Sequence, residues 1–351
     1  MPKIAAVAVA VPPHRITQPE AAAFAAAHFR THREEIDRML PVFDHAGIRS
    51  RYFCVPPEWH TEPHSFREAN ELYIEWSTKL GAQVIDNCLR QVGRLPGEID
   101  HLLFVSTTGL ATPSIDARLV NVLGLNPHIR RTPIWGLGCA GGVAGLSHAY
   151  QLALADPTAC VMLAAVELCG LTFQSDDYST ANMVACALFA DGAAGVLVTG
   201  DEVDADGPSI VGTQSTIWPD SLGVMGWNFT AHGMQVVFSR AIPAIVREKA
   251  RRNLDEFLAG HGLSCAEVRH WILHPGGQKV LEAYAQALDL APDDLAVARE
   301  VLCDYGNMSS PTVLFVLEKV LSAGRIKPGE TALLTALGPG FSAENVLLAG
   351  W

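Results

Sequence analysis

The chain has 351 residues, of which 49% are hydrophobic and 18% are charged. This composition excludes disordered, collagen-like and mucin-like proteins. The net charge of −12 disfavours a nucleic-acid partner, and no apolar run reaches the ~18 residues of a membrane span. Eight cysteines without a CxxC motif or a paired rhythm predict reduced thiols and a cytoplasmic protein without integral membrane association.

Strands and helices alternate along the first half of the chain. The stretch 3–11 alternates as a buried strand does, unlike a signal peptide, and Thr17, Pro19 and Glu20 predict a capped helix start. Helices are expected at residues 18–29, 34–43, 70–92 and 140–155. Buried strands are expected at residues 101–107 and 159–167 and after the turn at Asp191-Gly192, and residues 54–66 predict a loop.

The second half repeats this order with little sequence identity. Thr107 and Cys139 are 32 residues apart, and His274 and Asn307, which end a strand and precede a helix in the same way, are 33 apart. We therefore predict a duplicated α/β unit with parallel buried strands, divided into residues 1–205 and 206–351. The pseudo-symmetry would bring these four residues together, and the closing hairpin at 332–349 is expected to pair with the Asp191-Gly192 region.

Cys139 is the strongest candidate for a reactive residue. Gly138 precedes it and Gly141-Gly142 follow, so the backbone can turn tightly and a substrate can approach the sulfur. A cysteine at a helix start feels the positive end of the helix dipole, where the thiol pKa can fall from ~8.5 to as low as ~4 to 6, which predicts mostly thiolate at pH 7. A buried apolar cysteine is the commoner role of a free thiol, but the surrounding glycines favour the reactive one.

His274 and Asn307 each have a structural alternative. His274 precedes Pro275-Gly276-Gly277, where an imidazole can enter a cleft, but twelve other histidines compete for such a role. Asn307 could equally cap the helix that follows it. Together with Cys139 they supply a nucleophilic thiol, an imidazole that stabilises the thiolate, and two N–H donors for an enolate oxygen. The three residues therefore predict an acyl-transfer site.

Five sequence blocks, in this order, resemble the signature motifs of type III polyketide synthases, the chalcone and stilbene synthase group. The blocks are residues 136–142, 188–192, 272–277, 305–310 and Gly338-Pro339-Gly340. Other segments are most similar to bacterial members that make long-chain alkylpyrones or alkylresorcinols; these are residues 54–66, 107–113 and 167–173. The resemblance implies an α/β, thiolase-like duplicated αβαβα layered fold, a homodimer, and neither a metal nor a redox cofactor.

The resemblance also implies a role for each motif residue. Cys139 would take a starter acyl group from coenzyme A, while His274 and Asn307 would hold malonyl-CoA during decarboxylation and Claisen condensation. Phe189 matches the family's gate between the coenzyme A tunnel and the cavity, and a gapless match places Val236 at the second gate position. Further substrate-binding positions implied in this way are Thr107, Thr108, Thr112, Cys169, Leu171, Thr172, Met308, Ser309, Gly338, Pro339, Gly340 and Phe341.

Two of these positions carry less bulk than in plant members of the family, namely Thr112 and Val236. With Cys169 and Thr108 they predict a deep apolar tunnel, in which each buried CH₂ of a chain contributes ~0.8 kcal/mol. We therefore expect a fatty acyl-CoA starter, extended by malonyl-CoA and cyclised to an alkylpyrone or alkylresorcinol. The starter length, the number of extensions and the choice between aldol and lactone closure stay open.

Basic residues that could hold coenzyme A are few. The family's three basic positions at the tunnel mouth fall on Arg38, Pro41 and His45, so only Arg38 keeps a permanent charge. Further candidates are Arg49, Arg51 and Lys279, although surface basic residues are more often simply solvated.

Three other functions fit part of the pattern. A ketoacyl synthase III-like enzyme, which condenses once on an acyl carrier protein, shares the fold and the triad type, but the blocks after His274 and Asn307 favour the polyketide group. A non-catalytic acyl-CoA-binding protein would not need an intact Cys139, His274 and Asn307. A thiol hydrolase of the Cys-His-Asn kind leaves the Asp191-Gly192 and Gly338-Pro339-Gly340 blocks unexplained.

Overall fold

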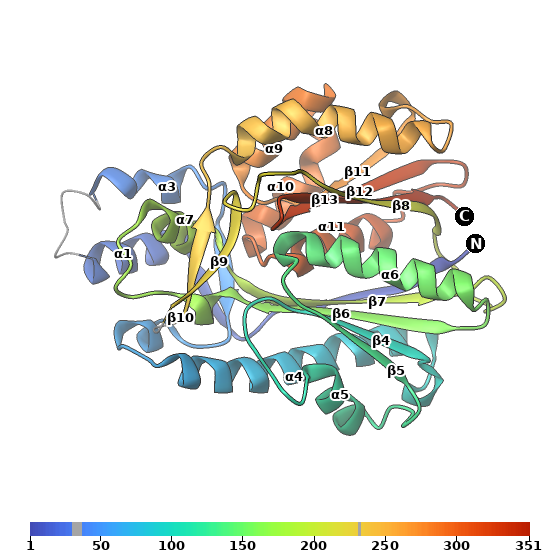
Figure 1. Cartoon of the computed structure of the whole chain (residues 1–351), viewed down its shortest axis with the longest axis horizontal. Coiled ribbons are helices and arrows are strands. Elements are labelled where there is room, and N and C mark those ends of the chain that lie inside the picture. The colour runs from blue at the N-terminus through green and yellow to red at the C-terminus, as the bar shows by residue number, and fades with distance from the viewer. Residues whose placement is uncertain (30–36, 231–232) are drawn as a thin grey trace.

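The computed structural model describes residues 1–29, 37–230 and 233–351, which form five alternating layers of helices and strands (Figure 1). The main sheet contains β1 (Lys3–Ala10), β4 (His101–Val105), β5 (Arg130–Ile134), β6 (Cys160–Leu168), β7 (Asp191–Thr199), β8 (Ser209–Ile217), β11 (His270–Leu273), β12 (Thr331–Gly338) and β13 (Ser342–Ala349). Two small sheets pair β2 (His14–Thr17) with β3 (Ser50–Phe53), and β9 (Met225–Thr230) with β10 (Gly233–Phe238).

The helices cover both outer faces and fill the middle layer. They are α1 (Gln18–His28), α3 (Pro41–Asp44), α4 (Phe66–Val92), α5 (Ile115–Leu123), α6 (Gly141–Ala155), α7 (Thr180–Leu188), α8 (Ile242–Ala259), α9 (Gln278–Leu288), α10 (Ala296–Tyr305) and α11 (Ser310–Ser322). No helix in the described ranges is long and apolar enough to cross a membrane.

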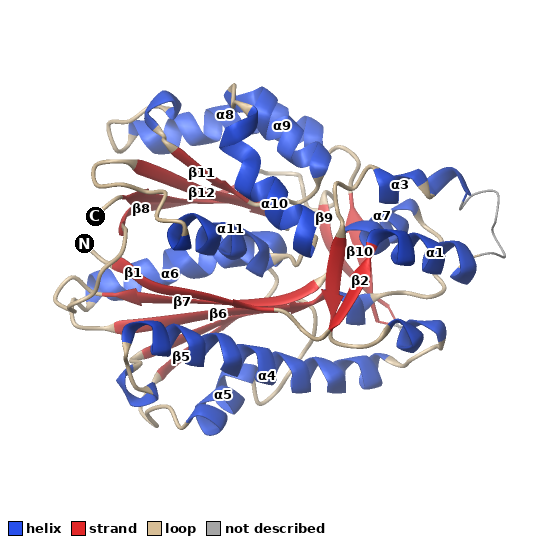
Figure 2. Cartoon of the chain, turned by 180° about the vertical axis from the view of Figure 1, so that it is seen from behind, coloured by secondary structure: helices blue, strands red, loops and turns tan. Residues whose placement is uncertain are grey.

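The main sheet bends into two layers at one weak junction. Its strand order is β11-β12-β13-β8-β1-β7-β6-β4-β5, and β1 meets β8 only through the pair Lys3 and Ser209. This break lets the two halves of the sheet face each other with α6 and α11 between them (Figure 2). Both middle helices contact strands of both halves, so the apolar core is continuous across the layers.

The two halves have the same strand order and directions. In the first half, β4 and β6 are parallel, and β6, β7 and β1 follow in antiparallel pairs. In the second half, β11 and β12 are parallel, and β12, β13 and β8 follow in antiparallel pairs. This match supports our proposal of a duplicated unit divided into residues 1–205 and 206–351. The closing hairpin pairs with β8 and β11, however, so its predicted pairing with the Asp191-Gly192 region is wrong.

Helix starts follow local capping. Thr17 forms the predicted capping box with Glu20 at the start of α1. The second long helix, α4, begins at Phe66, earlier than predicted, because Ser65 and Glu68 form the same reciprocal cap. Of the helix predicted at residues 34–43, the first three lie outside the described residues, and the structure forms α3 at its end.

Candidate active site

Cys139 lies in a short 3₁₀ turn, Gly138–Ala140, immediately before α6. The turn depends on its glycines: Gly138 has a φ of +46°, and a Cβ there would lie 2.8 Å from a ring carbon of Pro339. A Cβ on Gly142 would lie 2.2 Å from the backbone oxygen of Ser310, so α6 and α11 touch backbone to backbone. The glycines that flank Cys139 therefore allow α6 and α11 to approach each other closely at their N-terminal ends.

Asn307 connects the Cys139 turn to the His274 loop. Its Oδ1 lies 4.0 Å from the Cys139 Sγ and accepts a hydrogen bond of 2.8 Å from the Ser309 backbone N–H. Its Nδ2 donates to the Gly276 backbone oxygen at 3.2 Å. The side chain thus satisfies the N–H of Ser309, the residue just before α11, and at the same time contacts the reactive sulfur.

His274 follows β11 and is buried, with 4% of its surface exposed. Neither ring nitrogen has a hydrogen-bond partner, and burial lowers the pKa of the imidazole to about 3. Strand β12 and helix α11 each contact both the Cys139 turn and strand β11, which His274 follows. The His274 backbone N–H also donates to the Thr335 backbone oxygen of β12. The structure therefore brings Cys139, His274 and Asn307 into one region, with an imidazole free to bind a ligand.

The thiolate predicted for Cys139 does not form in the empty site. Burial raises the pKa of the Cys139 thiol to about 11; the charge of Glu167 adds to this rise, and hydrogen bonds from Ser309 and Asn307 oppose it. The prediction from the helix dipole is wrong because burial removes the sulfur from water, which disfavours the charged form. Cys139 and His274 are therefore both neutral before substrate binds.

Glu167 is a site residue that the sequence reasoning missed. Its carboxylate lies at the end of β6, fully buried, and accepts hydrogen bonds from the Thr107 N–H and the hydroxyls of Thr108 and Ser310 at 2.9 to 3.0 Å. Burial raises its pKa to about 7, although these donors oppose the rise. The available signal was an acidic residue inside an otherwise apolar strand, since burying a carboxylate is costly unless donors surround it.

The raised pKa of Glu167 predicts how stability depends on pH. The unfolded chain loses this proton near pH 4.5 and the folded chain near pH 7, so the folded state is favoured less as pH rises between these values. We expect Glu167 to lower the free energy of unfolding by about 1.4 kcal/mol per pH unit in this window. Buried His274, His60 and Asp191 also make stability depend on pH, so the contribution of Glu167 is the difference in slope between the wild type and Glu167→Gln in urea unfolding at pH 5, 6 and 7. Equal slopes in the two proteins would contradict the assignment.

The Phe189 gate has an aromatic neighbour that the sequence analysis did not name. The Phe189 ring packs edge-on against Phe238, with centroids 6.1 Å apart, whereas Val236 lies two residues earlier on β10. Val236 lines the neighbouring cavity, as expected for a substrate position. The register of the β9–β10 hairpin brings Phe238 to Phe189, and Val236 stays the predicted second gate position.

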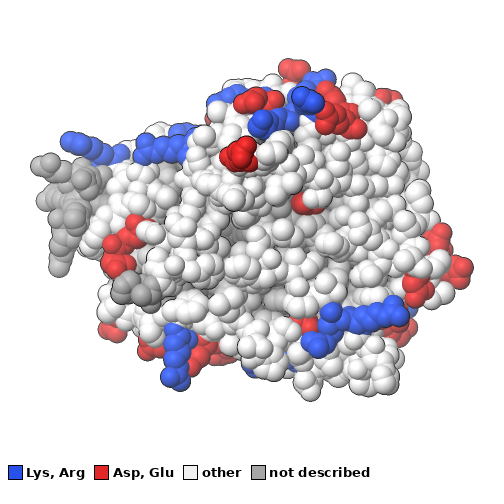
Figure 3. Space-filling view, in the orientation of Figure 1, with Lys and Arg blue, Asp and Glu red and all other residues white. Residues whose placement is uncertain are grey.

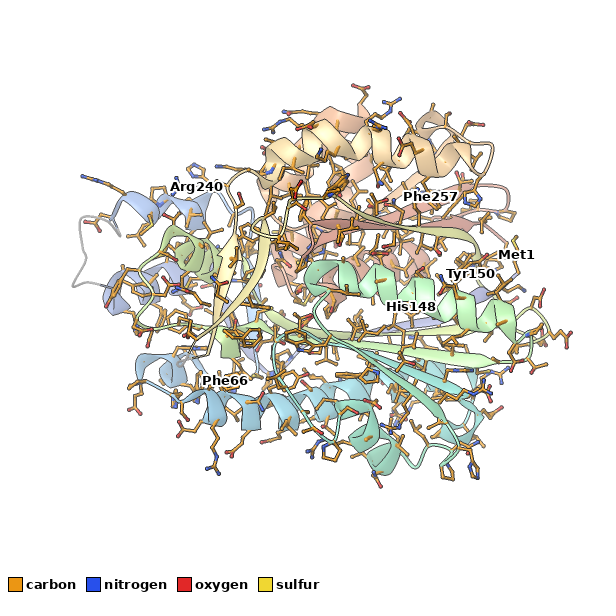
Figure 4. The ribbon with its side chains drawn as sticks, viewed as in Figure 1. Met1, Phe66, His148, Tyr150, Arg240 and Phe257 are labelled. Carbon is orange, nitrogen blue, oxygen red and sulfur yellow. The ribbon has the colours of Figure 1, made fainter. Side chains whose placement is uncertain are left out.

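Two cavities border the β9–β10 hairpin, and Phe189 lines the first of them. The first, here called the starter cavity, has a volume of about 300 Å³; its lining includes Phe24, Arg51, Phe53, His60, Cys169, Thr172, Phe173, Cys186, Phe189, Trp227 and Val236. The second measures about 250 Å³ and is lined by Thr108, Leu171 and Thr172, among others. In Figure 4, Phe66 lies near the lower end of the β9–β10 hairpin and Arg240 near its upper end, so the hairpin spans this side of the molecule.

The remaining predicted positions divide into two groups. Thr107 accepts a hydrogen bond of 3.1 Å from the Gly138 N–H, so it lies directly behind the Cys139 turn. Residues that pack around the same turn or the segments beside it are Met308, Ser309, Gly338 and Pro339. Gly340 and Phe341 instead contact residues at the end of β8 and just after it: Gly340 packs against Ile217, and the Phe341 ring packs against Trp218. Thr112 is exposed and lines neither cavity, so this chain alone does not bring it to the site.

The four basic residues predicted to hold coenzyme A differ in their exposure to solvent. Arg38, Arg49 and Lys279 are exposed, and Arg49 forms an ion pair of 2.5 Å with Asp304. The loop before Arg49 reaches the start of α9, beside Lys279. Arg51, in contrast, has 2% of its surface exposed and lines the starter cavity. Its prediction as a residue of an exposed tunnel mouth is wrong because β3 directs it into the interior.

The duplicated five-layer architecture is a thiolase-like fold, as expected from the sequence. Family models of chalcone and stilbene synthases match the chain twice, the N-terminal domain at residues 3–202 and the C-terminal domain at residues 209–351. A chalcone synthase-like protein of Bacillus subtilis (strain 168) is 41% identical, with 99% of this chain and 98% of that protein covered. A 1,3,6,8-tetrahydroxynaphthalene synthase of Streptomyces peucetius is 38% identical, with 98% and 92% covered.

Solved structures agree with this result. The crystal structure of 1,3,6,8-tetrahydroxynaphthalene synthase from Streptomyces coelicolor, a bacterial type III polyketide synthase, superposes with a TM-score of 0.94, 28% identity and 99% coverage of both chains. A polyketide synthase of the brown alga Ectocarpus siliculosus gives a TM-score of 0.91 at 27% identity, with 100% of this chain and 98% of that chain covered. The chain belongs to the chalcone and stilbene synthase family. It is therefore an acyltransferase of the type III polyketide synthase class that depends on malonyl-CoA.

Proposed function

We propose that this enzyme loads a fatty acyl-CoA starter on Cys139, extends it with malonyl-CoA and releases an alkylpyrone or an alkylresorcinol. The observation that carries the catalytic assignment is the position of Asn307, which contacts the Cys139 sulfur through one end of its amide and the His274 loop through the other. A thiol, a free imidazole and an amide N–H then face one substrate.

Loading would begin from the neutral pair. Cys139 Sγ attacks the thioester carbonyl while its proton passes to a free nitrogen of His274, so that thiolate and imidazolium arise together. Burial disfavours either charge alone, and their mutual attraction offsets part of that cost. The imidazolium then returns the proton to the departing sulfur of coenzyme A. Cys139 carries the acyl group, and His274 is neutral again.

Extension would use the same donors for a second thioester. An N–H of His274 and the Asn307 Nδ2–H hold the thioester oxygen of malonyl-CoA, and CO₂ leaves as the negative charge moves onto that oxygen. The resulting enolate carbon attacks the acyl carbonyl on Cys139, and the Cys139 thiolate leaves. The product is a β-ketoacyl-CoA two carbons longer, which can return to Cys139 for another cycle.

The starter cavity supports an alkyl chain as the starter. Its lining is mostly apolar and aromatic, and Val236 contributes a small side chain beside the Phe189 gate. Each CH₂ buried there contributes ~0.8 kcal/mol, equivalent to a few-fold in affinity. A chain of several methylenes is therefore favoured over acetyl.

A ladder of acyl-CoA starters from acetyl to stearoyl, each with malonyl-CoA, tests this proposal by mass spectrometry of the products. We expect Cys139-dependent pyrones or resorcinols from long starters. Val236→Phe should lower kcat/KM for decanoyl-CoA relative to acetyl-CoA at least tenfold, because the new ring fills the cavity beside Phe189. Val211→Phe, at a residue that lines neither cavity, should keep the wild-type ratio. Products from short starters alone would rule out the fatty acyl starter.

A single condensation on an acyl carrier protein is the alternative reaction, and it keeps the same triad. The ladder distinguishes it when repeated with acyl carrier protein thioesters. If acyl carrier protein thioesters are turned over and coenzyme A esters are not, a single condensation of the ketoacyl synthase III kind is favoured over our proposal.

We also propose a homodimer that works in the cytoplasm, where coenzyme A thioesters are available. Figure 3 shows one face with few charged side chains around its centre, over α6 and the β9–β10 hairpin. Large apolar side chains exposed on this chain include Leu110, Trp135, Ile217, Leu222 and Phe229. A second copy covering such a face would remove them from water.

A further inference from the structure

The starter cavity is lined by a buried arginine that feels the charge of Asp191 but forms no direct ion pair among the described residues. Arg51 on β3 has 2% of its surface exposed, and no Asp or Glu among the described residues lies within ion-pair distance of it. The nearby Asp191 carboxylate is used elsewhere, since it accepts hydrogen bonds from the Cys54 and Gly170 backbone N–H groups at 2.8 and 2.7 Å. Burying an arginine without a counter-ion is costly unless a ligand completes its contacts.

The guanidinium is held firmly and still has a donor to spare. One terminal nitrogen of Arg51 donates to the Phe189 backbone oxygen at 2.7 Å, and the group lies 5.4 Å from the centre of the Phe53 ring. The stem packs against Gly306, where a Cβ would lie 2.7 Å from the Arg51 Cγ. The Nε–H is buried and has no partner. An arginine fixed in this way is preorganised to bind a planar anion.

A second unpartnered polar atom borders the same cavity. His60 is 9% exposed, packs edge-on against Phe24, Phe53 and Phe173, and its Nδ1 has no hydrogen-bond partner. The rest of the wall is largely aromatic and apolar. The cavity therefore combines a surface that suits methylene groups with two polar atoms that suit one oxygen-bearing group.

We propose that the starter cavity binds an acyl-CoA whose chain ends in a carboxylate, with Arg51 as the partner of that carboxylate. This inference rests on the proposed function and narrows its starter class: the methylene stem packs on the aromatic wall, and the far end pairs with the guanidinium. A carboxylate supplies both the charge and the acceptor oxygens that Arg51 lacks, whereas a methyl end supplies neither.

Matched pairs of starters test the proposal. The ω-carboxyacyl thioesters succinyl-, adipoyl-, suberoyl- and sebacoyl-CoA are compared with butanoyl-, hexanoyl-, octanoyl- and decanoyl-CoA, and with the methyl esters of the four ω-carboxyl groups. For at least one length we expect kcat/KM to be tenfold or more higher for the carboxylate than for the plain chain, and the methyl ester to lose that advantage. If no carboxylate exceeds its plain counterpart in the wild-type enzyme, the proposal is overturned.

Variants show whether Arg51 is responsible. Arg51→Met should lower the ratio between carboxylate and plain chain at least tenfold, and Arg51→Lys should retain part of it, because lysine keeps the charge but not the planar geometry. Arg90→Met removes an exposed arginine of α4 that lines neither cavity and should keep the wild-type ratio. A merely structural Arg51 would predict equal losses for both kinds of starter, with a lower melting temperature, and this result would also overturn the proposal.

The two levels of inference fail differently. If plain acyl-CoA starters give Cys139-dependent products and carboxylates have no advantage, only the carboxylate inference falls. If no coenzyme A thioester of either kind gives a product, the proposed function falls, and the inference that rests on it falls too.

Discussion

Replacing Cys139 by alanine should separate the two halves of the reaction. Condensation products from decanoyl-CoA and malonyl-CoA should fall by at least about 10³-fold, because the variant lacks the thiol that contacts Asn307 and would accept the acyl group. Decarboxylation of malonyl-CoA to acetyl-CoA should stay within about tenfold of the wild type, since the N–H donors of His274 and Asn307 remain. Product yield and acetyl-CoA release, measured in one assay by mass spectrometry, report both steps.

The complementary variant is Asn307→Ala. It removes one N–H donor from the enolate oxygen, so decarboxylation itself should fall by about 10²-fold or more. Cys303→Ala provides the matched control, because this half-buried cysteine lies outside both cavities and should react as the wild type does. Condensation products that persist in Cys139→Ala, or decarboxylation unaffected by Asn307→Ala, would contradict the assigned roles.

Gly142→Ala should destabilise the protein more than the same substitution at the other glycines of α6, Gly141 and Gly145. The new Cβ would lie 2.2 Å from the backbone oxygen of Ser310, so α6 and α11 must separate at their N-terminal ends. Overpacking against backbone leaves no flexible side chain to move away, and we expect a loss of about 3 kcal/mol in the free energy of unfolding. Urea unfolding at pH 6 measures the loss as a lower midpoint at an unchanged slope.

The same substitution at a solvent-facing glycine is the control. A Cβ on Gly97 would meet no atom within 4 Å, so Gly97→Ala should change the free energy of unfolding by no more than about 0.5 kcal/mol. Because Cys139 and Asn307 lie just before the two helices that Gly142 holds together, turnover should fall in Gly142→Ala and not in Gly97→Ala. Equal stability of the two variants would show that α6 and α11 can separate without cost.

Local sequence patterns predicted the parts of the fold that depend on nearby residues. The capping box at Thr17 and Glu20, the buried strands and the glycine-flanked Cys139 all lie where the sequence places them. The pairing of the closing hairpin was wrong, because it depends on β8, which lies between that hairpin and the first half of the sheet. Hydrophobic alternation tells a strand from a helix, but it does not choose among several apolar strands as neighbours.

In the candidate site, too, the sequence predicted features that depend on nearby residues and missed those that depend on distant segments. Motif order and spacing were sufficient to select Cys139, His274 and Asn307, since a catalytic set needs particular side chains at particular turns. They did not predict that Cys139 is a neutral thiol, because its pKa follows from burial by segments distant in the sequence. Glu167 was missed for a related reason: its three hydrogen-bond donors come from two other segments.

What the sequence by itself determined about this protein is its family, its nucleophile and the order of its elements, because each of these is written in residues that are adjacent or regularly spaced. Only the tertiary structure decided that Phe238 packs against Phe189, and that Arg51 faces a cavity and not the solvent. Strand register and the direction in which a strand turns its side chains into the interior depend on long-range packing. Residue counts along the chain do not contain that information.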